Sequence, residues 1–310
     1  MRAVTARNGG RSPALWQIPA AAVWLILFIA FSFTLELPNN RPIHRGDLLP
    51  LVPSLLDLVD PPPAGPDDSP QMVAMRQNSG WRYFPQRFDL LAVAGAILAG
   101  AWGIGHLLLR ALRLPPTISS LERTVLAMGS GLTCLSLMTL GAGLAGWLSR
   151  PLLGALMGAG LCSECTLRWR NRHASVQAVS EEQRFPWFWL LGLTPFLLCM
   201  LLGAALPSTD FDVNEYHFQG PKEFYQNGRI SFLAHNVYTS FPFGTEMLTL
   251  LAMVLRDDWY RGALAGKCAL MAFAPLTGLT LFAAGRRWLG STSGALAAFL
   301  YLSTPWTYRI

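Results

Sequence analysis

Charged residues are scarce in this chain of 310 residues. Asp, Glu, Lys and Arg make up 14% of it, while 52% of the residues are hydrophobic and the mean hydropathy is +0.34. An ordinary soluble domain has about 25% charged residues, so this shortage argues against one. Because the deficit is concentrated in long apolar windows, it predicts a protein with several membrane spans.

Cysteine is also scarce, and five residues account for all of it. Cys162 and Cys165 have the CxxC spacing that in a soluble thioredoxin-like protein would indicate redox chemistry. No second CxxC or pair of histidines accompanies them to complete a zinc site. We therefore interpret the cysteines as small residues in or beside membrane helices (Cys134, Cys162, Cys165, Cys199 and Cys268).

Positive charge is in excess, with a formal net charge of +6 and a pI near 9.3. The arginines cluster at the ends of apolar segments, which is typical of topology signals rather than of a phosphate-binding face. Nucleic acid is therefore not an expected partner, and the lipid bilayer is.

The apolar segments predict an all-α membrane protein, a polytopic bundle of about seven transmembrane helices with short interfacial helices in an external loop. Helices are expected because irregular backbone and open sheet edges leave polar groups unsatisfied in lipid. The first segment, with Arg2, Arg7 and Arg11 before it, could also be a signal peptide. Its length and the lack of a small-residue cleavage motif favour a retained helix. The predicted spans are Leu15–Leu35, Leu90–Leu109, Thr124–Trp147, Pro151–Leu167, Trp187–Leu206, Gly262–Ala284 and Thr292–Trp306.

A further apolar stretch, Phe243–Leu255, is too short to be a span. At about 1.5 Å per residue it cannot cross a hydrocarbon core of about 30 Å. Glu246 lies inside it, and charged residues follow it directly. We predict an interfacial helix lying on the membrane, which fixes the sidedness of everything that follows.

Arginine placement predicts a multi-pass protein of the inner or plasma membrane with a cytoplasmic N-terminus. The arginines of the long first loop oppose this orientation, but those that closely flank the spans favour it. Four parts follow: residues 1–35 as N-terminus and first span, 36–88 as an external Pro-rich loop, 89–186 as additional spans of unassigned role, and 187–310 as a core with an external loop over 207–261. The arginines that favour the orientation are Arg110, Arg113, Arg123, Arg168, Arg170, Arg172, Arg286 and Arg287.

The external loop begins with "STDFDVNEYHFQGPKEFYQNGRI", residues 208–230. If this segment is helical, Asp212, Glu215, Tyr216 and Gln219 share one face. Thr209 or Asp210 would cap the helix, Gly220–Pro221 would end it, and a second short helix would run over Lys222–Gln226 to Asn227–Gly228. A carboxylate there could act as a general base or hold a divalent cation.

Structural interpretations of the same residues stay open. Asp210 could be a helix cap alone, and Glu215 could face water. Tyr216 could be one of the aromatic residues enriched at headgroup level, and a lone histidine such as His217 is more often structural than a ligand. Spacing alone therefore indicates a reaction site only weakly.

The stretch "DFDVNEYHFQGPKEFYQNGRISFLAHNVYTSFPFGTEML" resembles the first external loop of GT-C-type glycosyltransferases, as in the dolichyl-phosphate-mannose mannosyltransferases. These integral membrane enzymes take a sugar from a polyprenyl-phosphate donor by an inverting displacement. "LFAAGRRWLG" and Pro305 are similar to the ends of later spans in that family, so the resemblance covers about residues 187–306.

The resemblance implies site residues. Asp212 matches the catalytic base, and Asp210 adds an Asp-x-Asp pattern that could bind a metal, although family members differ on this. Tyr216 and His217 match positions that line the acceptor or donor-phosphate site, and Glu215 is a further candidate for substrate binding. On charge alone, two basic residues could meet the lipid phosphate (Lys222 and Arg229).

Two departures from the family matter. Residues 1–186 match no part of it, and the chain stops at Ile310, where family members usually continue through several more spans. We therefore expect either a truncated product or the N-terminal part of a split enzyme, whose site a second chain would complete.

Two other classes stay open: a transporter or flippase, and a non-catalytic or degenerate membrane protein. A carrier keeps ionisable residues at mid-membrane, whereas His106 and Lys267 lie nearer the ends of their predicted spans than the centres. Because the polar chemistry gathers at the outer surface, group transfer at the interface is the favoured prediction.

Overall fold

A computed structural model describes residues 16–36, 44–47, 65–66, 69–70, 73, 85–115, 117–170, 187–208 and 210–304. The described residues fall into two compact units, one within Ile18–Asp89 and one formed mainly by Leu90–Ile310. This part of the chain is helical and contains no strand beyond an isolated bridge between Glu36 and His44. Most of the predicted external loop 36–88 lies outside the described residues, as do Thr209 and Pro305.

The first unit contains α1 (Gln17–Thr34), which matches the first predicted span. Its large apolar side chains are exposed, among them Ile26, Leu27 and Phe31. Exposed apolar side chains along a whole helix suit a lipid environment rather than water.

Three helices of the described chain are long and apolar enough to cross a membrane: Pro85–Ala111, Ser120–Ala145 and Trp259–Leu289. They contain α4 (Phe88–Ala111), α5 (Ser120–Ala145), and α10 (Trp259–Met271) continued by α11 (Phe273–Leu289). They support a membrane protein, but the predicted total of about seven spans is not confirmed. The other predicted spans correspond to α1, α6 (Arg150–Arg170), α7 (Trp187–Ala204) and α12 (Ser291–Ser303), which are shorter or less apolar.

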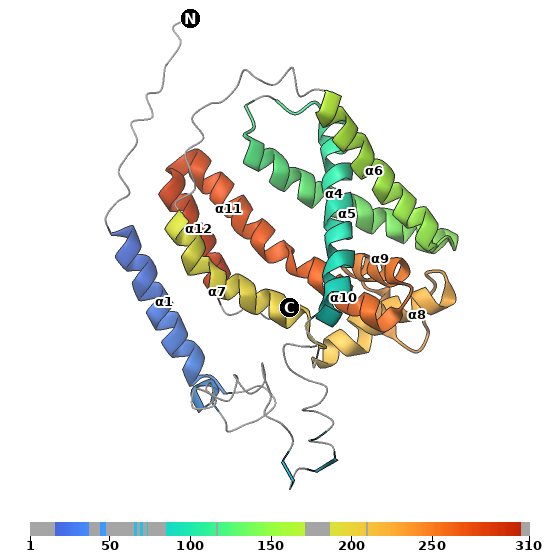
Figure 1. The fold of residues 1–310 in the computed structure, drawn as a ribbon, viewed down its shortest axis with the longest axis horizontal. Helices are drawn as coiled ribbons and strands as arrows, with labels where there is room; N and C mark the ends of the chain where they lie inside the picture. The colour runs from blue at the N-terminus through green and yellow to red at the C-terminus, as the bar shows by residue number, and fades with distance from the viewer. Residues whose placement is uncertain are drawn as a thin grey trace, which may run out of the picture. The chain divides into compact units, whose positions relative to one another are not determined.

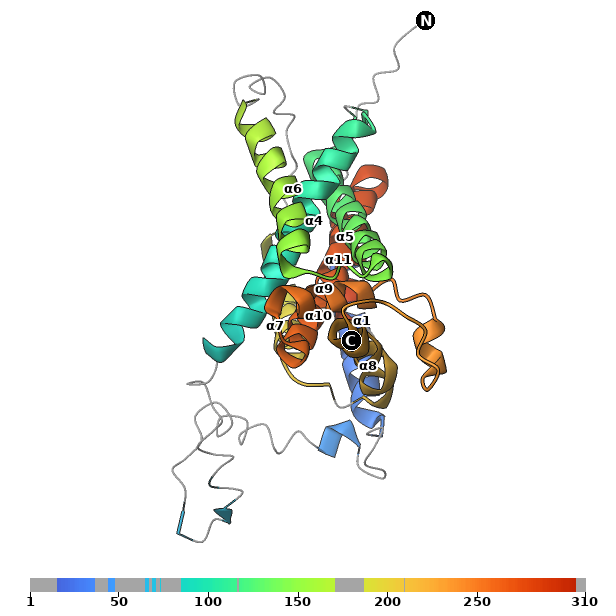
Figure 2. The ribbon, with the colours of Figure 1, turned by 90° about the vertical axis from the view of Figure 1, so that its right-hand side faces the viewer.

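Helix α4 crosses α5 and α6, as Figure 2 shows for α6. A methyl group added at Gly105 would overlap the carbonyl oxygen of Ala127 on α5, and one at Gly103 would lie 2.6 Å from the Cα of Leu161 on α6. Small residues at membrane helix crossings let the backbones approach closely. The Gly- and Ala-rich composition of these helices thus has a direct packing role.

Helix α9 (Glu246–Arg256) is the most completely buried helix of the loop region in the second unit. It packs against α5, α6, α8 and α10, and Leu250, Leu251, Ala252 and Met253 are fully buried. Its 11 residues are too few to span the membrane, as predicted. Residues 246–254 are all buried, so protein encloses most of this helix. Its predicted position on the membrane surface stays a prediction.

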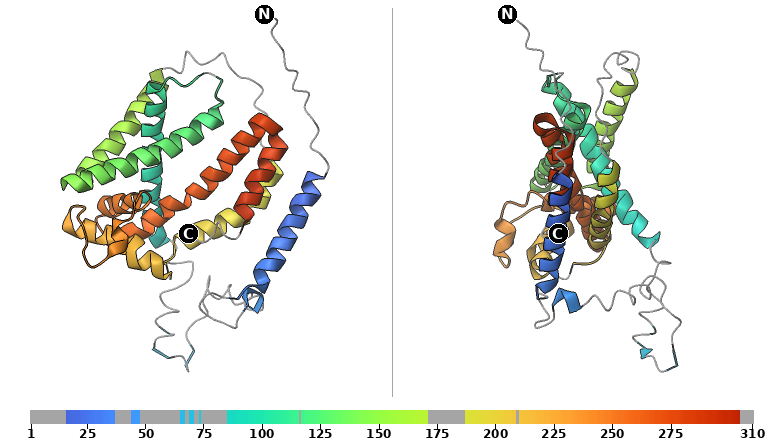
Figure 3. Two further views of the ribbon diagram at one scale, coloured as in Figure 1. Left: turned by 180° about the vertical axis from the view of Figure 1, so that it is seen from behind. Right: turned by 90° about the vertical axis from the view of Figure 1, so that its left-hand side faces the viewer.

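Helices α11 and α12 form a close antiparallel pair, and α7 runs beside α12 (Figure 3). The ring of Phe299 on α12 lies 5.3 Å from that of Trp189 and 6.2 Å from that of Phe196, both on α7. Helix α5, from residues 89–186, packs against both α9 and α11 of residues 187–310.

Arginines predicted to share one side of the membrane do gather in the second unit. Arg286 donates to Ser119 Oγ at 3.1 Å, and Arg287 Nη1 lies 2.9 Å from a carboxylate oxygen of Glu122. These contacts join the end of α11 to the start of α5 and are consistent with the predicted topology.

Helix α6 contains a buried carboxylate that the sequence analysis did not include among the ionisable residues of the predicted spans. Glu164 has a fully buried side chain within the predicted span Pro151–Leu167. Arg110 Nε lies 2.8 Å from it and Arg168 Nε 2.7 Å, and Arg168 Nη2 is 3.1 Å from Nε2 of His106. The sequence interpretation, which weighed only His106 and Lys267, is therefore corrected on this point.

Candidate functional site

The start of the external loop folds as one continuous helix over residues 211–227. A π-helix, η4 (Val213–Phe218), leads into α8 (Gln219–Asn227), which ends at Gly228 with φ of 67°. Helix α8 lies against α9 and α10 at one end of the second unit (Figure 1). The predicted stop at Asn227–Gly228 is confirmed, because Gly228 adopts the left-handed conformation that ends helices.

The predicted break at Gly220–Pro221 is wrong. Pro221 is the third residue of α8 and lies inside the continuous helix, directly after the π-helical turns. A Cβ at Gly220 would lie 2.8 Å from the ring of Phe243, so this glycine lets the later part of the loop pack closely. The Gly–Pro pair thus serves packing rather than helix termination.

Asp210 caps this helix. Its Oδ1 accepts a hydrogen bond from the backbone N–H of Asp212 at 3.1 Å, and Asn214 Nδ2 donates to the carbonyls of Ser208 and Asp210 at 3.0 Å each. One of the two predicted caps is thereby confirmed, and the predicted substrate contact of Asp210 stays a prediction.

Tyr216 and His217 lie in a group of rings between the π-helix and the later loop. The Tyr216 ring stacks on that of Tyr238, in η5 (Val237–Ser240), with centroids 5.1 Å apart. It also lies 4.4 Å from the ring of His217. Both predicted residues therefore line one surface, joined by an aromatic residue that sequence reasoning missed.

His217 is held by a buried carboxylate. Its Nδ1 lies 2.6 Å from Oε1 of Glu246, and Thr245 Oγ1 is 3.1 Å from the other oxygen of that carboxylate. Glu246 is 8% exposed and begins α9. A contact of this kind fixes the imidazole orientation. The sequence signal for Glu246 was a lone acidic residue within an apolar run.

Asp212 and Glu215 are the uncommitted carboxylates of this segment. Both are exposed, and neither side chain receives a hydrogen bond from the described residues. Asp212 and Glu215 differ in their effect on the pKa of Tyr216. Desolvation, and next the carboxylate of Asp212, raise the pKa of Tyr216, with smaller contributions from Asp210 and Glu246. Asp212 is therefore the free carboxylate beside the aromatic surface.

The side chain of Gln219 is engaged by a carboxylate of the same helix. Its Nε2 donates to Glu223 Oε1 at 2.7 Å, and His235 Nε2 lies 3.0 Å from the same carboxylate. The π-helix changes the register, because its hydrogen bonds run from residue i to i+5. Burial opposes ionisation of Glu223, but the hydrogen bonds from Gln219 and His235 hold its pKa below the usual value.

Lys222 lines a pocket of about 250 Å³ between the segment after α7, the loop helix and the start of α10. Its Nζ lies 4.3 Å from the centre of the Trp259 ring. Ser208 and Asn214 line the same pocket, which therefore reaches the turn that carries Asp212. A pocket lined by a cation and by hydrogen-bonding groups suits a phosphorylated polar ligand.

Arg229 is not part of this arrangement. It is exposed, does not line the pocket, and its side chain has no hydrogen-bond or ion-pair partner among the described residues. The geometry therefore gives no support to its predicted contact with phosphate.

Asn236 is a further residue that sequence reasoning missed. Its side chain is buried, and Nδ2 donates to the backbone carbonyl of Glu215 at 2.9 Å, while Oδ1 has no partner in the described part of the chain. This amide fastens residues 231–245 to the π-helix and so fixes Tyr238 opposite Tyr216.

In the part of the chain that the structure describes, no group of three His, Cys, Asp or Glu side chains is arranged to hold a metal ion. Cys162 and Cys165 are free thiols. Comparisons with protein-family models, with curated proteins and with solved structures found no match. The chemistry of the site is therefore argued from its own residues.

Proposed function

We propose that this chain is a membrane glycosyltransferase, or the part of one that carries the catalytic base. It would transfer a sugar from a polyprenyl-phosphate donor to an acceptor hydroxyl on the outer face of the membrane. The observation that carries the proposal is the uncommitted carboxylate of Asp212 beside the paired rings of Tyr216 and Tyr238.

Most other acidic side chains around the site have structural partners. Asp210 caps the loop helix, Glu246 holds His217, and Glu223 binds Gln219 and His235. Asp257 accepts from Tyr225 at 3.0 Å, and Asp258 accepts from two backbone N–H groups at the start of α10. Of the two carboxylates left, Asp212 is the one whose charge contributes to the raised pKa of Tyr216, and it is the better candidate for a base.

The proposed reaction is an inverting displacement. The carboxylate of Asp212 removes the proton from the acceptor hydroxyl as that oxygen bonds to the anomeric carbon of the sugar. The bond from that carbon to the donor phosphate breaks, and the phosphate leaves with its electron pair. Lys222, which lines the pocket, would stabilise the charge that develops on the phosphate.

The aromatic surface supplies orientation. Tyr216 and Tyr238 present stacked rings, and apolar sugar faces pack well against aromatic side chains. His217 is anchored through Glu246, so the surface is fixed to the buried helix α9. A preorganised surface of this kind reduces the entropy lost when the substrates are aligned.

The ionisable groups inside the helices favour transfer over transport. Glu164 is engaged by Arg110 and Arg168, and Lys267 Nζ donates to the carbonyls of Gly203 and Leu206 at 3.2 Å each. These groups stabilise helix ends and contacts, whereas a carrier needs such groups along its substrate path.

The test is sugar transfer in reconstituted vesicles, with a panel of polyprenyl-phosphate hexoses offered to the purified chain. Asp212→Asn should lower the transfer rate about 100-fold or more, the usual contribution of a general base. Glu215→Gln, one helical turn away, should lower it less than about 10-fold, because it would lose a substrate contact only.

A larger loss with Glu215→Gln would assign the base to that residue instead. Full activity of Asp212→Asn, or no transfer from any donor by the wild-type chain, would contradict the proposal. Insertion and thermal unfolding of each variant should match the wild type, because Asp212 makes no side-chain hydrogen bond with the described residues.

A further inference from the structure

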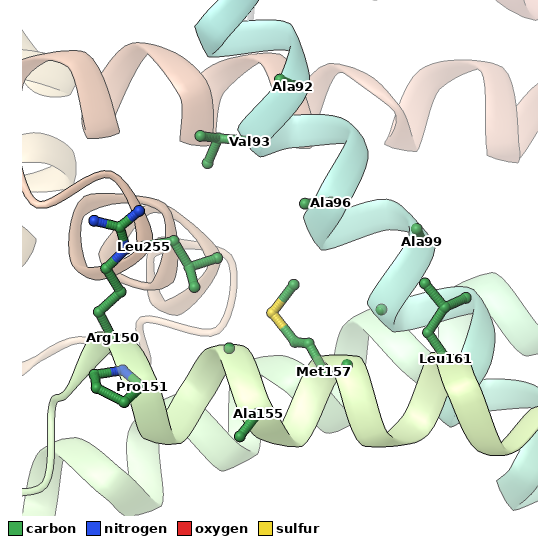
Figure 4. Close-up of a pocket in the computed structure, with 13 residues that line it drawn as sticks. Ala92, Val93, Ala96, Ala99, Arg150, Pro151, Ala155, Met157, Leu161 and Leu255 are labelled. Atoms are coloured by element: carbon green, nitrogen blue, oxygen red, sulfur yellow. The ribbon is translucent and has the colours of Figure 1, made fainter.

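A second hollow, of about 710 Å³, lies between α4 and α6, apart from the loop site. Figure 4 shows Ala96 on α4 and Met157 on α6 on the two sides of this hollow, with Arg150 and Leu255 at one end of it. We call this hollow the α4–α6 groove. Several of its walls, among them Ala92, Ala96 and Ala155, are exposed, so the groove opens to the surroundings of the protein.

The groove exists because α4 and α6 cross rather than run parallel. They meet tightly where a Cβ at Gly160 would lie 2.6 Å from Ile104, and where Gly103 touches Leu161. From that crossing they diverge toward Arg150, as Figure 4 shows. Small side chains allow close packing at the crossing. Where the helices diverge, the same small side chains leave an apolar channel between them.

We propose that the α4–α6 groove binds one acyl chain of an anionic phospholipid of the bilayer, with the lipid phosphate held by Arg150. Arg150 is the one charged residue that lines the groove among the described residues, and no described side chain pairs with it. A guanidinium fits phosphate oxygens with two parallel hydrogen bonds.

The net charge of the ligand follows from the lining. No acidic side chain of the described chain faces the groove, so nothing there would attract the ammonium of a zwitterionic headgroup. The headgroup of phosphatidylglycerol carries a phosphate and no ammonium, so its single negative charge is compensated by Arg150. The groove should therefore prefer phosphatidylglycerol to phosphatidylcholine.

The length of the groove fits one leaflet. From Arg150 to Leu161 the helix α6 rises about 16 Å at about 1.5 Å per residue, and half of a hydrocarbon core of about 30 Å is about 15 Å. A chain that begins at Arg150 would thus end near the middle of the bilayer. The groove is apolar over the same length, apart from its charged end.

The position of Trp147 independently places Arg150 at headgroup level. Trp147 is 67% exposed and lies in the turn between α5 and α6, three residues before Arg150. Exposed tryptophans of membrane proteins gather at the interface. The same turn lies near the loop site, since the N–H of Ile230 donates to the carbonyl of Gly143 at 2.9 Å. The lipid would therefore lie in the leaflet on the side of residues 207–261.

Native mass spectrometry of the purified full chain from mixed phosphatidylglycerol and phosphatidylcholine micelles tests this proposal. The wild type should retain one phosphatidylglycerol in preference to phosphatidylcholine. Arg150→Gln should weaken that binding about tenfold, since Arg150 is exposed and its replacement leaves the fold intact. Ala155→Phe, which fills the groove, should abolish it.

Two matched variants serve as controls. Ala159→Phe places the same ring one turn further along α6, at an exposed position outside the groove, and Arg170→Gln removes an exposed arginine at the other end of that helix. Both should retain phosphatidylglycerol as the wild type does. A photoactivatable phosphatidylglycerol should crosslink to peptides containing Met157 or Leu161 in the wild type and not in Ala155→Phe.

Other occupants give distinct results. Equal retention of both lipids, or equal retention by all four variants, would overturn the proposal. Displacement of phosphatidylglycerol by an equimolar polyprenyl phosphate would assign the groove to a polyprenyl chain instead. A dimer that Ala155→Phe dissociates would show that a second copy of the chain covers the groove. None of these outcomes depends on the glycosyltransferase proposal.

Discussion

Glu164 and Glu246 are buried carboxylates that link distant parts of the chain. Glu164 receives hydrogen bonds from Arg110 of α4 and Arg168 of its own helix, and Glu246 contacts His217 of the loop helix. A buried carboxylate without such partners would be strongly destabilising. Each carboxylate therefore stabilises a contact between helices. Glu164 joins α4 to α6 beyond the groove, and Glu246 joins the loop helix to α9.

Glu223 gives a pH-dependent test of the loop helix. Its pKa in the folded chain lies below the usual value of 4.5. A carboxyl group of this kind stabilises the fold above its unfolded pKa and loses that contribution as the pH falls through the folded pKa. Glu223→Gln should therefore lower the free energy of unfolding by about 1 kcal/mol at pH 7, and the difference should shrink below pH 4.5.

Thermal unfolding in detergent between pH 3.5 and pH 7 measures this difference. Glu215→Gln is the matched control, because its exposed carboxylate accepts no hydrogen bond from the described residues. It should leave stability nearly unchanged at both ends of the range. A Glu223→Gln deficit that stays constant to pH 3.5 would show that packing, and not the charged hydrogen bonds, is responsible.

At the scale of helices, the crossing of α4 and α5 depends on glycine. Gly105→Ala would place a methyl group on the carbonyl oxygen of Ala127, which is backbone and cannot move aside without shifting the helix. We expect a loss of about 1–3 kcal/mol of stability, as for other overpacked contacts. Gly129→Ala on α5 meets nothing within 4 Å and should instead stabilise its helix by up to about 1 kcal/mol.

The measurement is the unfolding midpoint of both variants in the same detergent. If Gly105→Ala and Gly129→Ala shift the midpoint equally, the close crossing of α4 and α5 does not exist in the membrane protein. Opposite shifts would confirm that the glycines of these helices differ in role although the sequence presents them alike.

The length of the apolar runs predicted the long helices well. The short-range sequence pattern predicted the ends and the surroundings of the short helices less well. The predicted positions of α1, α4, α5, α6 and α7 follow from long apolar runs, which only helices satisfy in lipid. The burial of α9 was not predicted, because its few residues give the same pattern whether lipid or protein surrounds them. The helix over 211–227 was broken wrongly at Gly220–Pro221, because the packing of Phe243 on Gly220 is a tertiary contact.

The sequence predicted the site residues that are close together in the chain, but not those that come from distant positions. Asp212, Tyr216 and His217 are close in sequence, and the structure brings them to one region. Their supporting residues, Tyr238 and Glu246, come from positions 22 or more residues away, which spacing on one helix cannot reveal. The family resemblance singled out Asp212, and that role stays a prediction.

For the whole molecule, two groups of residues define opposite ends of the second unit. One end has the basic residues around Glu164 and the contacts of Arg286 and Arg287 with the start of α5. The other has the loop helix, α9 and the turn with Trp147. The helices α5 and α10–α11 run between these ends and are long enough to cross a bilayer. Charge and aromatic placement thus agree on one membrane axis.

Sidedness can be measured on this axis with two single cysteines in a background that lacks the five native ones. Ser231→Cys lies at the loop end and Arg170→Cys at the basic end, and both positions are exposed. Because positive charge stays on the cytoplasmic side, a membrane-impermeant maleimide should label Ser231→Cys on intact cells and reach Arg170→Cys only after permeabilisation. The reverse pattern would place the proposed reaction site in the cytoplasm, and labelling of both before permeabilisation would show that the two ends do not lie on opposite sides of a membrane.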